Sequence, residues 1–165
     1  MSRRLLSRAG AVILALMLKV IAVGTDGSAT ADKALEFAID LAVRHDAKLV
    51  VLSAYNSNPS AWVSGVMAAG WVDPGPLEPQ WNPQEAERVE QLLVHAERRA
   101  QKRGVECSSA SREGDPAETL VELAERHEAD VLVIGNRGMQ RRVLGSVPDT
   151  ITHKARCSVF VVKTT

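Results

Sequence analysis

After Met17 the chain alternates between short apolar runs and longer segments with helical spacing. Short runs rich in β-branched residues are typical of buried strands, whereas apolar residues repeating every three or four positions are typical of helices. Five strands alternating with helices predict an α/β fold with right-handed crossovers and a parallel sheet covered on both faces. The expected strands are Leu18–Gly24, Lys48–Ala54, Val105–Ser111, Asp130–Gly135 and Ser158–Lys163, and the expected helices are Ala29–His45, Gln84–Arg103, Ala117–Glu128 and Gly145–Ala155.

The composition is typical of one globular domain with its own core. The chain has 165 residues, of which 45% are hydrophobic and 24% are charged. Twenty basic residues balance twenty acidic residues, so no net charge attracts nucleic acid or an acidic membrane surface. Cys107 and Cys157 lack CxxC spacing, and we interpret them as reduced thiols of a cytoplasmic protein.

The N-terminal residues 1–16 are expected to lie outside the fold. Three arginines followed by an apolar run resemble a signal peptide. The run nevertheless passes through Met17 and Lys19 into the first expected strand without a clear cleavage site. We therefore place the domain at 17–165 and expect a cytoplasmic protein. No segment reaches the roughly 20 apolar residues that a membrane-spanning helix needs.

The fourth expected strand leads into a candidate binding site. The apolar run Val131–Ile134 ends at Gly135, and Gly138 follows; glycines allow a backbone to approach a ligand closely. Gly145–Ser146 then opens a helix, whose unpaired N–H groups favour an anion such as phosphate. A second glycine-containing turn, Gly24–Ser28, follows the first strand. If these two strands are neighbours, both turns face one crevice, where such sheets bind ligands.

The motifs do not supply a catalytic set. The four histidines lack metal-ligand spacing, and no Ser/His/Asp set, carboxylate pair or nucleophilic cysteine can be assembled. We therefore expect a binding protein that is not an enzyme and has no metal site of its own. Slow ATP hydrolysis remains an alternative, although no base is assigned to activate water.

Taken together, the segments resemble the universal stress protein family over residues 17–165. Gly24–Ser28 matches the opening signature of that family. Gly135–Gly138 and Gly145–Ser146 resemble its nucleotide motif, in which two glycines are separated by two residues, and Gly-Ser or Gly-Thr follows after nine further residues. The end of the chain, Cys157–Val162, matches as well.

The resemblance implies a Rossmann-like, adenine nucleotide alpha hydrolase-like three-layer fold with strand order 3-2-1-4-5. It also implies a homodimer paired through Val159–Val162 and a stress-related regulatory role through ATP, with or without Mg²⁺, or a related adenine nucleotide. Asp26 would contact ribose or a phosphate-bound metal, Thr25 would offer backbone groups to adenine, and Ala54 would pack on adenine. The implied binding residues are Gly24, Thr25, Asp26, Ala54, Ile134, Gly135, Arg137, Gly138, Gly145, Ser146 and Val147.

One departure from the family pattern leaves alternatives open. Only the six residues Met139–Leu144 separate Gly138 from Gly145, where nucleotide-binding members have nine. The chain is therefore either an ATP-binding regulator, a binder of cyclic AMP, or a dimeric interaction protein without ATP binding. Asp26 and Ser146 also have simpler interpretations as turn or helix-cap residues. The segment between Tyr55 and Pro83 carries all three tryptophans and is either a binding loop or a loop that packs its own aromatic rings.

Overall fold

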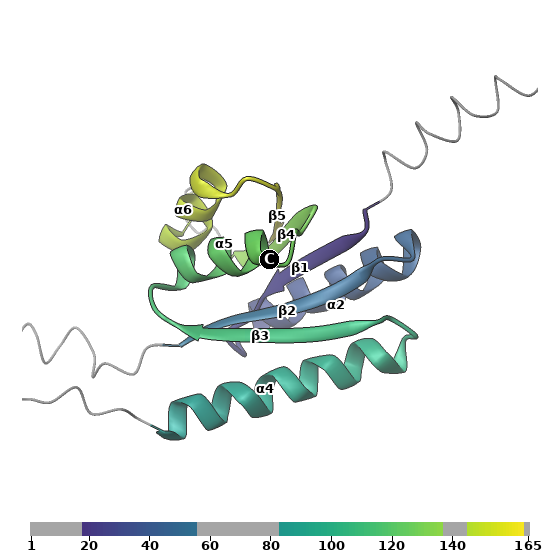
Figure 1. The fold of residues 1–165 in the computed structure, drawn as a ribbon, viewed down its shortest axis with the longest axis horizontal. Coiled ribbons are helices and arrows are strands. Elements are labelled where there is room, and N and C mark those ends of the chain that lie inside the picture. The colour runs from purple at the N-terminus through teal and green to yellow at the C-terminus, as the bar shows by residue number, and fades with distance from the viewer. Residues whose placement is uncertain (1–17, 56–82, 137–144, 164–165) are drawn as a thin grey trace, which may run out of the picture.

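The computed structural model describes residues 18–55, 83–136 and 145–163, which form a parallel sheet with helices on both faces (Figure 1). The sheet has five strands in the order β3-β2-β1-β4-β5, and every neighbouring pair is parallel. This confirms the predicted fold class and strand order. The strands are β1 Val20–Gly24, β2 Lys48–Tyr55, β3 Cys107–Glu113, β4 Val131–Asn136 and β5 Ser158–Lys163, and the helices are α2 Ala29–His45, α4 Pro83–Lys102, α5 Pro116–Arg126 and α6 Ser146–Lys154.

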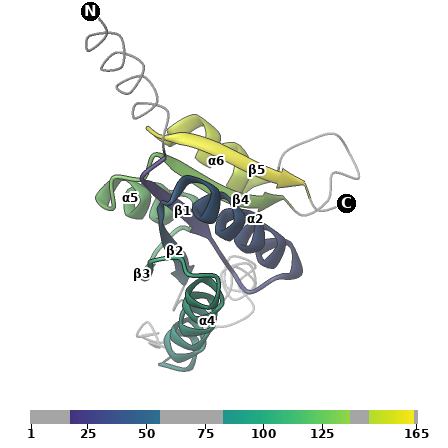
Figure 2. The ribbon, with the colours of Figure 1, turned by 90° about the vertical axis from the view of Figure 1, so that its right-hand side faces the viewer.

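Figure 2 shows helices on either side of the sheet. Two separate hydrophobic cores hold these three layers together. Ile21 and Val23 of β1 point into the core under α2 and α4, whereas Ala22 points into the core under α5 and α6. This alternation follows from the two-residue period of a strand. Because both faces are covered, the central strands are apolar on both sides. None of the described helices is long and apolar enough to cross a membrane.

The predicted start of the third strand is wrong by two residues. Val105 is buried, but it belongs to the turn that ends α4. Gly104 has a φ of +76°, and the Val105 N–H donates to the carbonyl oxygen of Ala100 at 3.1 Å. This is the hydrogen bond of a Schellman motif, which ends a helix at a glycine in the left-handed region. The strand therefore begins only at Cys107.

The winding of the chain reverses between β1 and β4. From β1 the chain proceeds outward to β2 and β3 and then returns to β4 on the other side of β1. Val23 of β1 lies opposite Val133 of β4, so the two strands end side by side. In open α/β sheets, the crevice at such a reversal is the usual place for a ligand.

Candidate functional site

A cavity of about 390 Å³ opens where β1 and β4 end. Its volume lies within the range of roughly 300 to 1,000 Å³ that is usual for small-molecule sites. The ends of β1, β2 and β4 and the starts of α2, α5 and α6 supply its wall. The lining residues are Gly24, Thr25, Asp26, Ser28, Thr30, Ala31, Ala54, Pro116, Leu120, Ile134, Gly135, Asn136, Gly145, Ser146, Val147 and Pro148.

The turn after β1 is held in place by its own hydrogen bonds. The Thr25 N–H donates to the carbonyl oxygen of Leu52 at 2.8 Å, and the Ser53 hydroxyl donates to the Thr25 carbonyl at 2.9 Å. The Ser28 N–H donates to Asp26 Oδ1 at 2.9 Å. The Thr25 N–H is thus already used, and its carbonyl, which has a second lone pair, is the backbone group left for a ligand. Asp26 both braces the turn and lines the cavity.

Gly24 and Gly135 allow helices to approach the ends of the two strands. A methyl group on Gly135 would lie 2.7 Å from the carbonyl oxygen of Thr30 in α2. A methyl group on Gly24 would lie 2.9 Å from Leu120 Cδ1 in α5. Glycine is thus required at Gly135 because the first turn of α2 packs directly on β4. This close approach of α2, rather than a tight turn, explains why glycine occupies position 135.

Three of the helices that the structure describes begin at the cavity, and two of them carry a side-chain cap. The Ser28 hydroxyl accepts the Ala31 N–H at the start of α2, and an Asp115 oxygen accepts two N–H groups at the start of α5. The N-cap of α6 is Gly145, which has no side chain to cap the helix. The interpretation of Ser146 as an N-cap is therefore wrong, since Ser146 is the first residue inside the helix.

Within the described part of the cavity wall, the start of α6 is therefore the place that best accepts an anion. Ser146 and Val147 present N–H groups at the positive end of the helix dipole. Pro148 has no N–H, and the Asp149 N–H donates to the Gly145 carbonyl. The N-terminal end of α6 thus offers two backbone N–H donors to the cavity. A phosphate group fits this arrangement.

The two cysteines lie away from the cavity and are poorly suited to nucleophilic chemistry. Both are free thiols, and neither lines the cavity. Burial raises the pKa of the Cys107 thiol to about 12, with a smaller contribution from Glu97. Burial also raises the pKa of Cys157. Both thiols therefore remain protonated near neutral pH, and a protonated thiol is a weak nucleophile.

The sequence matches the model of the universal stress protein family over residues 17–163. The chain belongs to this family. It is 31% identical over 152 residues to the universal stress protein Rv1636 of Mycobacterium tuberculosis H37Rv, covering 89% of this chain and 97% of that protein. It is 29% identical over 153 residues to the universal stress protein MJ0531 of Methanocaldococcus jannaschii, covering 89% of this chain and 83% of that protein.

Solved structures of family members share the fold. A universal stress protein in complex with cAMP has a TM-score of 0.65 and 29% identity, covering 90% of this chain and 99% of that chain. A family member from Burkholderia pseudomallei has a TM-score of 0.69 and 27% identity, covering 89% of this chain and 97% of that chain.

The structure brings nine of the eleven predicted binding residues together on the cavity wall. Arg137 and Gly138 lie outside the described residues, as does the shortened segment Met139–Leu144. Contact of any of the eleven with a nucleotide stays a prediction. The wall also contains residues that the family motif does not include, namely Ser28, Thr30, Ala31, Pro116, Leu120, Asn136 and Pro148.

The additional residues come mainly from helix starts. Pro116 follows the N-cap Asp115, a pair visible in the sequence, and α5 begins just after β3 ends. A helix that starts at the carboxyl end of a strand reaches the edge of the sheet where ligands bind. That signal could have placed Pro116 at the site. Leu120 and Thr30 reach it through tertiary packing, which no local pattern indicates.

Proposed function

We propose that the cavity binds an adenine nucleotide, with a phosphate group at the start of α6. The observation that carries the proposal is that the α6 N-terminus, which has no side-chain cap, opens into the cavity beside β1 and β4. Its two backbone donors and the helix dipole favour a phosphate. The structure of a universal stress protein in complex with cAMP, 29% identical to this chain, supports the same ligand class.

The remaining wall suits the other parts of a nucleotide. Ala54, Leu120 and Ile134 line the cavity with apolar side chains, which would pack against the base. Asp26 presents a carboxylate, which would accept hydrogen bonds from ribose hydroxyl groups or hold a phosphate-bound Mg²⁺. The nucleotide would thus extend from the end of β2 to the start of α6.

Two nucleotides are the main candidates. ATP with Mg²⁺ is favoured by the glycine motif of the sequence. Cyclic AMP is the second candidate, because Pro148 limits the helix start to two backbone donors and a single phosphate needs fewer partners. Calorimetric titration with ATP, ADP, AMP, cyclic AMP and adenosine ranks them.

Ser146→Pro tests the position of the phosphate. Proline is favoured at the first position of a helix, and Gly145 already has the extended conformation (φ −64°, ψ 161°) that precedes proline. The helix is therefore expected to remain intact while one phosphate donor is lost. A hydrogen bond to a charged group contributes roughly 1.5 to 3 kcal/mol, so calorimetry should show about 10- to 100-fold weaker AMP binding and unchanged adenosine binding.

Ala29→Pro is the matched control. It places proline at the first position of α2, whose start is already capped by Ser28, and nucleotide binding should be retained. Equal AMP affinity of Ser146→Pro and wild type would refute a phosphate at α6.

If wild type binds no nucleotide, inserting three small residues after Met139 separates the alternatives. Binding gained on insertion would identify the native chain as an interaction protein without ATP binding.

We also propose a homodimer that forms through β5. This strand lies at one edge of the sheet (Figure 2), where unpaired backbone groups can pair with another strand. Phe160 of β5 is 45% exposed and Phe37 of α2 is 39% exposed. Their ring centroids are 5.6 Å apart. A second copy of the chain would cover this aromatic pair.

Phe160→Lys is expected to convert the dimer to a monomer, because it places a charge in the proposed interface. Sedimentation velocity measures the change. Val94→Lys is the control, since Val94 is also 39% exposed but lies on α4. A dimer that survives Phe160→Lys would contradict pairing through β5.

We further propose that the protein is a cytoplasmic, stress-related regulator that binds nucleotide without hydrolysing it. Within the described wall of the cavity, Asp26 is the one ionisable side chain, and it accepts the Ser28 N–H. This arrangement supports a role in binding. Release of phosphate from ATP above the rate of a protein-free control would contradict the proposal.

A further inference from the structure

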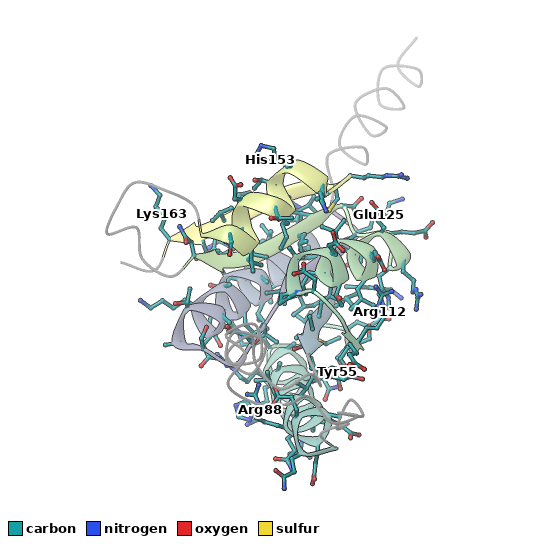
Figure 3. All side chains as sticks on the ribbon, turned by 90° about the vertical axis from the view of Figure 1, so that its left-hand side faces the viewer. Tyr55, Arg88, Arg112, Glu125, His153 and Lys163 are labelled. Carbon is teal, nitrogen blue, oxygen red and sulfur yellow. The ribbon has the colours of Figure 1, made fainter. Side chains whose placement is uncertain are left out.

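Helix α4, which the nucleotide motif does not include, lies beside the turn between Asp26 and Ser28. Gly27 has a φ of +76°, and a methyl group built on it would lie 3.4 Å from Leu92 Cδ1 and 3.9 Å from Arg88 Nη1. Arg88 extends from α4 (Figure 3). A guanidinium group therefore lies beside the turn that carries the carboxylate of the site.

Arg88 pairs with Glu85 and interacts electrostatically with Asp26. Its Nε and Nη2 atoms donate to the two carboxylate oxygens of Glu85 at 3.0 and 2.7 Å. Its Nη1 atom is the one that approaches Gly27. The pKa of Arg88 is raised, chiefly by the hydrogen bond to Glu85 and additionally by the charge of Asp26. Glu85 thus holds the guanidinium group in place, and the positive charge of the guanidinium acts on Asp26.

We propose that Arg88 is a specificity-determining residue of the nucleotide site, whose positive charge offsets Asp26 and favours anionic nucleotides over an uncharged nucleoside. The inference rests on the proposed function. Asp26 is the charged residue among the described residues of the cavity wall, and alone it would repel a phosphate. A cation beside the turn that carries Asp26 lowers that repulsion by its Coulomb field without having to touch the ligand. Adenosine, which carries no charge, does not sense this field.

Arg88→Gln tests the inference when AMP and adenosine are titrated into the full-length protein by calorimetry. Because the Arg88 side chain is 57% exposed, its field is partly screened, and the expected loss of AMP affinity is about two- to fivefold. Adenosine affinity should not change. Arg88→Lys should retain AMP binding, because it keeps the charge. Glu85→Gln should strengthen AMP binding, because it removes a competing negative charge.

Arg98→Gln is the matched control, since Arg98 is an exposed arginine of the same helix and its loss changes the net charge equally. The AMP effect of Arg88→Gln should shrink in 0.5 M salt, as a field effect does. Equal losses of affinity for AMP and adenosine would identify a structural role of Arg88. Either that result or an unchanged AMP affinity would overturn this inference but not the proposed function. A wild-type protein that binds neither ligand would overturn both the inference and the proposed function.

Discussion

Gly145→Asp is expected to stabilise the fold and to weaken nucleotide binding strongly. The N-cap of α6 has a conformation that aspartate adopts readily, with φ −64° and ψ 161°. Its Cβ would make only ordinary contacts, 3.7 Å from Pro148 Cδ and 3.8 Å from Asn136 Oδ1. The new carboxylate can accept the Val147 N–H, as N-cap side chains do. Capping and the helix dipole together should raise the free energy of unfolding by about 0.5 to 1 kcal/mol.

The same carboxylate would occupy the place proposed for the phosphate. Like charges in such contact cost several kcal/mol, so affinity for AMP should fall at least about 100-fold, which corresponds to roughly 2.7 kcal/mol. Urea unfolding and calorimetry measure the two effects on one protein sample. Because stability and binding change in opposite directions, unfolding cannot explain the loss of binding.

Gly145→Asn separates the charge from the hydrogen bond. Asparagine caps a helix about as well as aspartate but carries no charge, so it should weaken AMP binding far less. If Gly145→Asp binds AMP as tightly as wild type, the phosphate does not lie at α6, and the proposed orientation of the nucleotide is wrong.

The sheet could be predicted from the sequence because its signals are local. The apolar runs, the glycines after the first and fourth strands and the pair Asp115–Pro116 each indicate an element or its end. The strand order came with the family resemblance. The start of β3 could not be predicted in the same way. Val105 is apolar and buried, but a hydrogen bond to Ala100 assigns it to the end of a helix.

The site could be predicted only in part, because its wall combines motif residues with residues that arrive by packing. Gly24 and Gly145 are visible as glycines at the ends of elements. The sequence shows that Asn136 follows Gly135, but it does not show that Asn136 is buried (3% exposed) in the folded chain. The proximity of Arg88 to the Gly27 turn brings together residues 61 positions apart. No periodicity or spacing in the sequence reports such a contact.

Gly135→Ala is expected to destabilise the protein although it adds a single methyl group. That methyl would lie 2.7 Å from the carbonyl oxygen and 3.0 Å from the carbonyl carbon of Thr30, both backbone atoms of α2. Backbone cannot move aside as a side chain can, so the first turn of α2 must shift away from β4. Overpacking of this kind costs about 1 to 3 kcal/mol, which urea unfolding at 25 °C would detect.

Gly24→Ala is the informative comparison, because its methyl group would also meet a close neighbour. That neighbour is Leu120 Cδ1 at 2.9 Å, the end of a flexible side chain that can rotate. The loss of stability should therefore be clearly smaller, particularly since alanine restricts the unfolded chain more than glycine does. Thr30 and Ala31 line the cavity, so a shift of α2 in Gly135→Ala should weaken AMP binding as well. Equal stabilities of the two variants would show that the contact between α2 and β4 is not rigid, and the cavity would then owe its shape to other contacts.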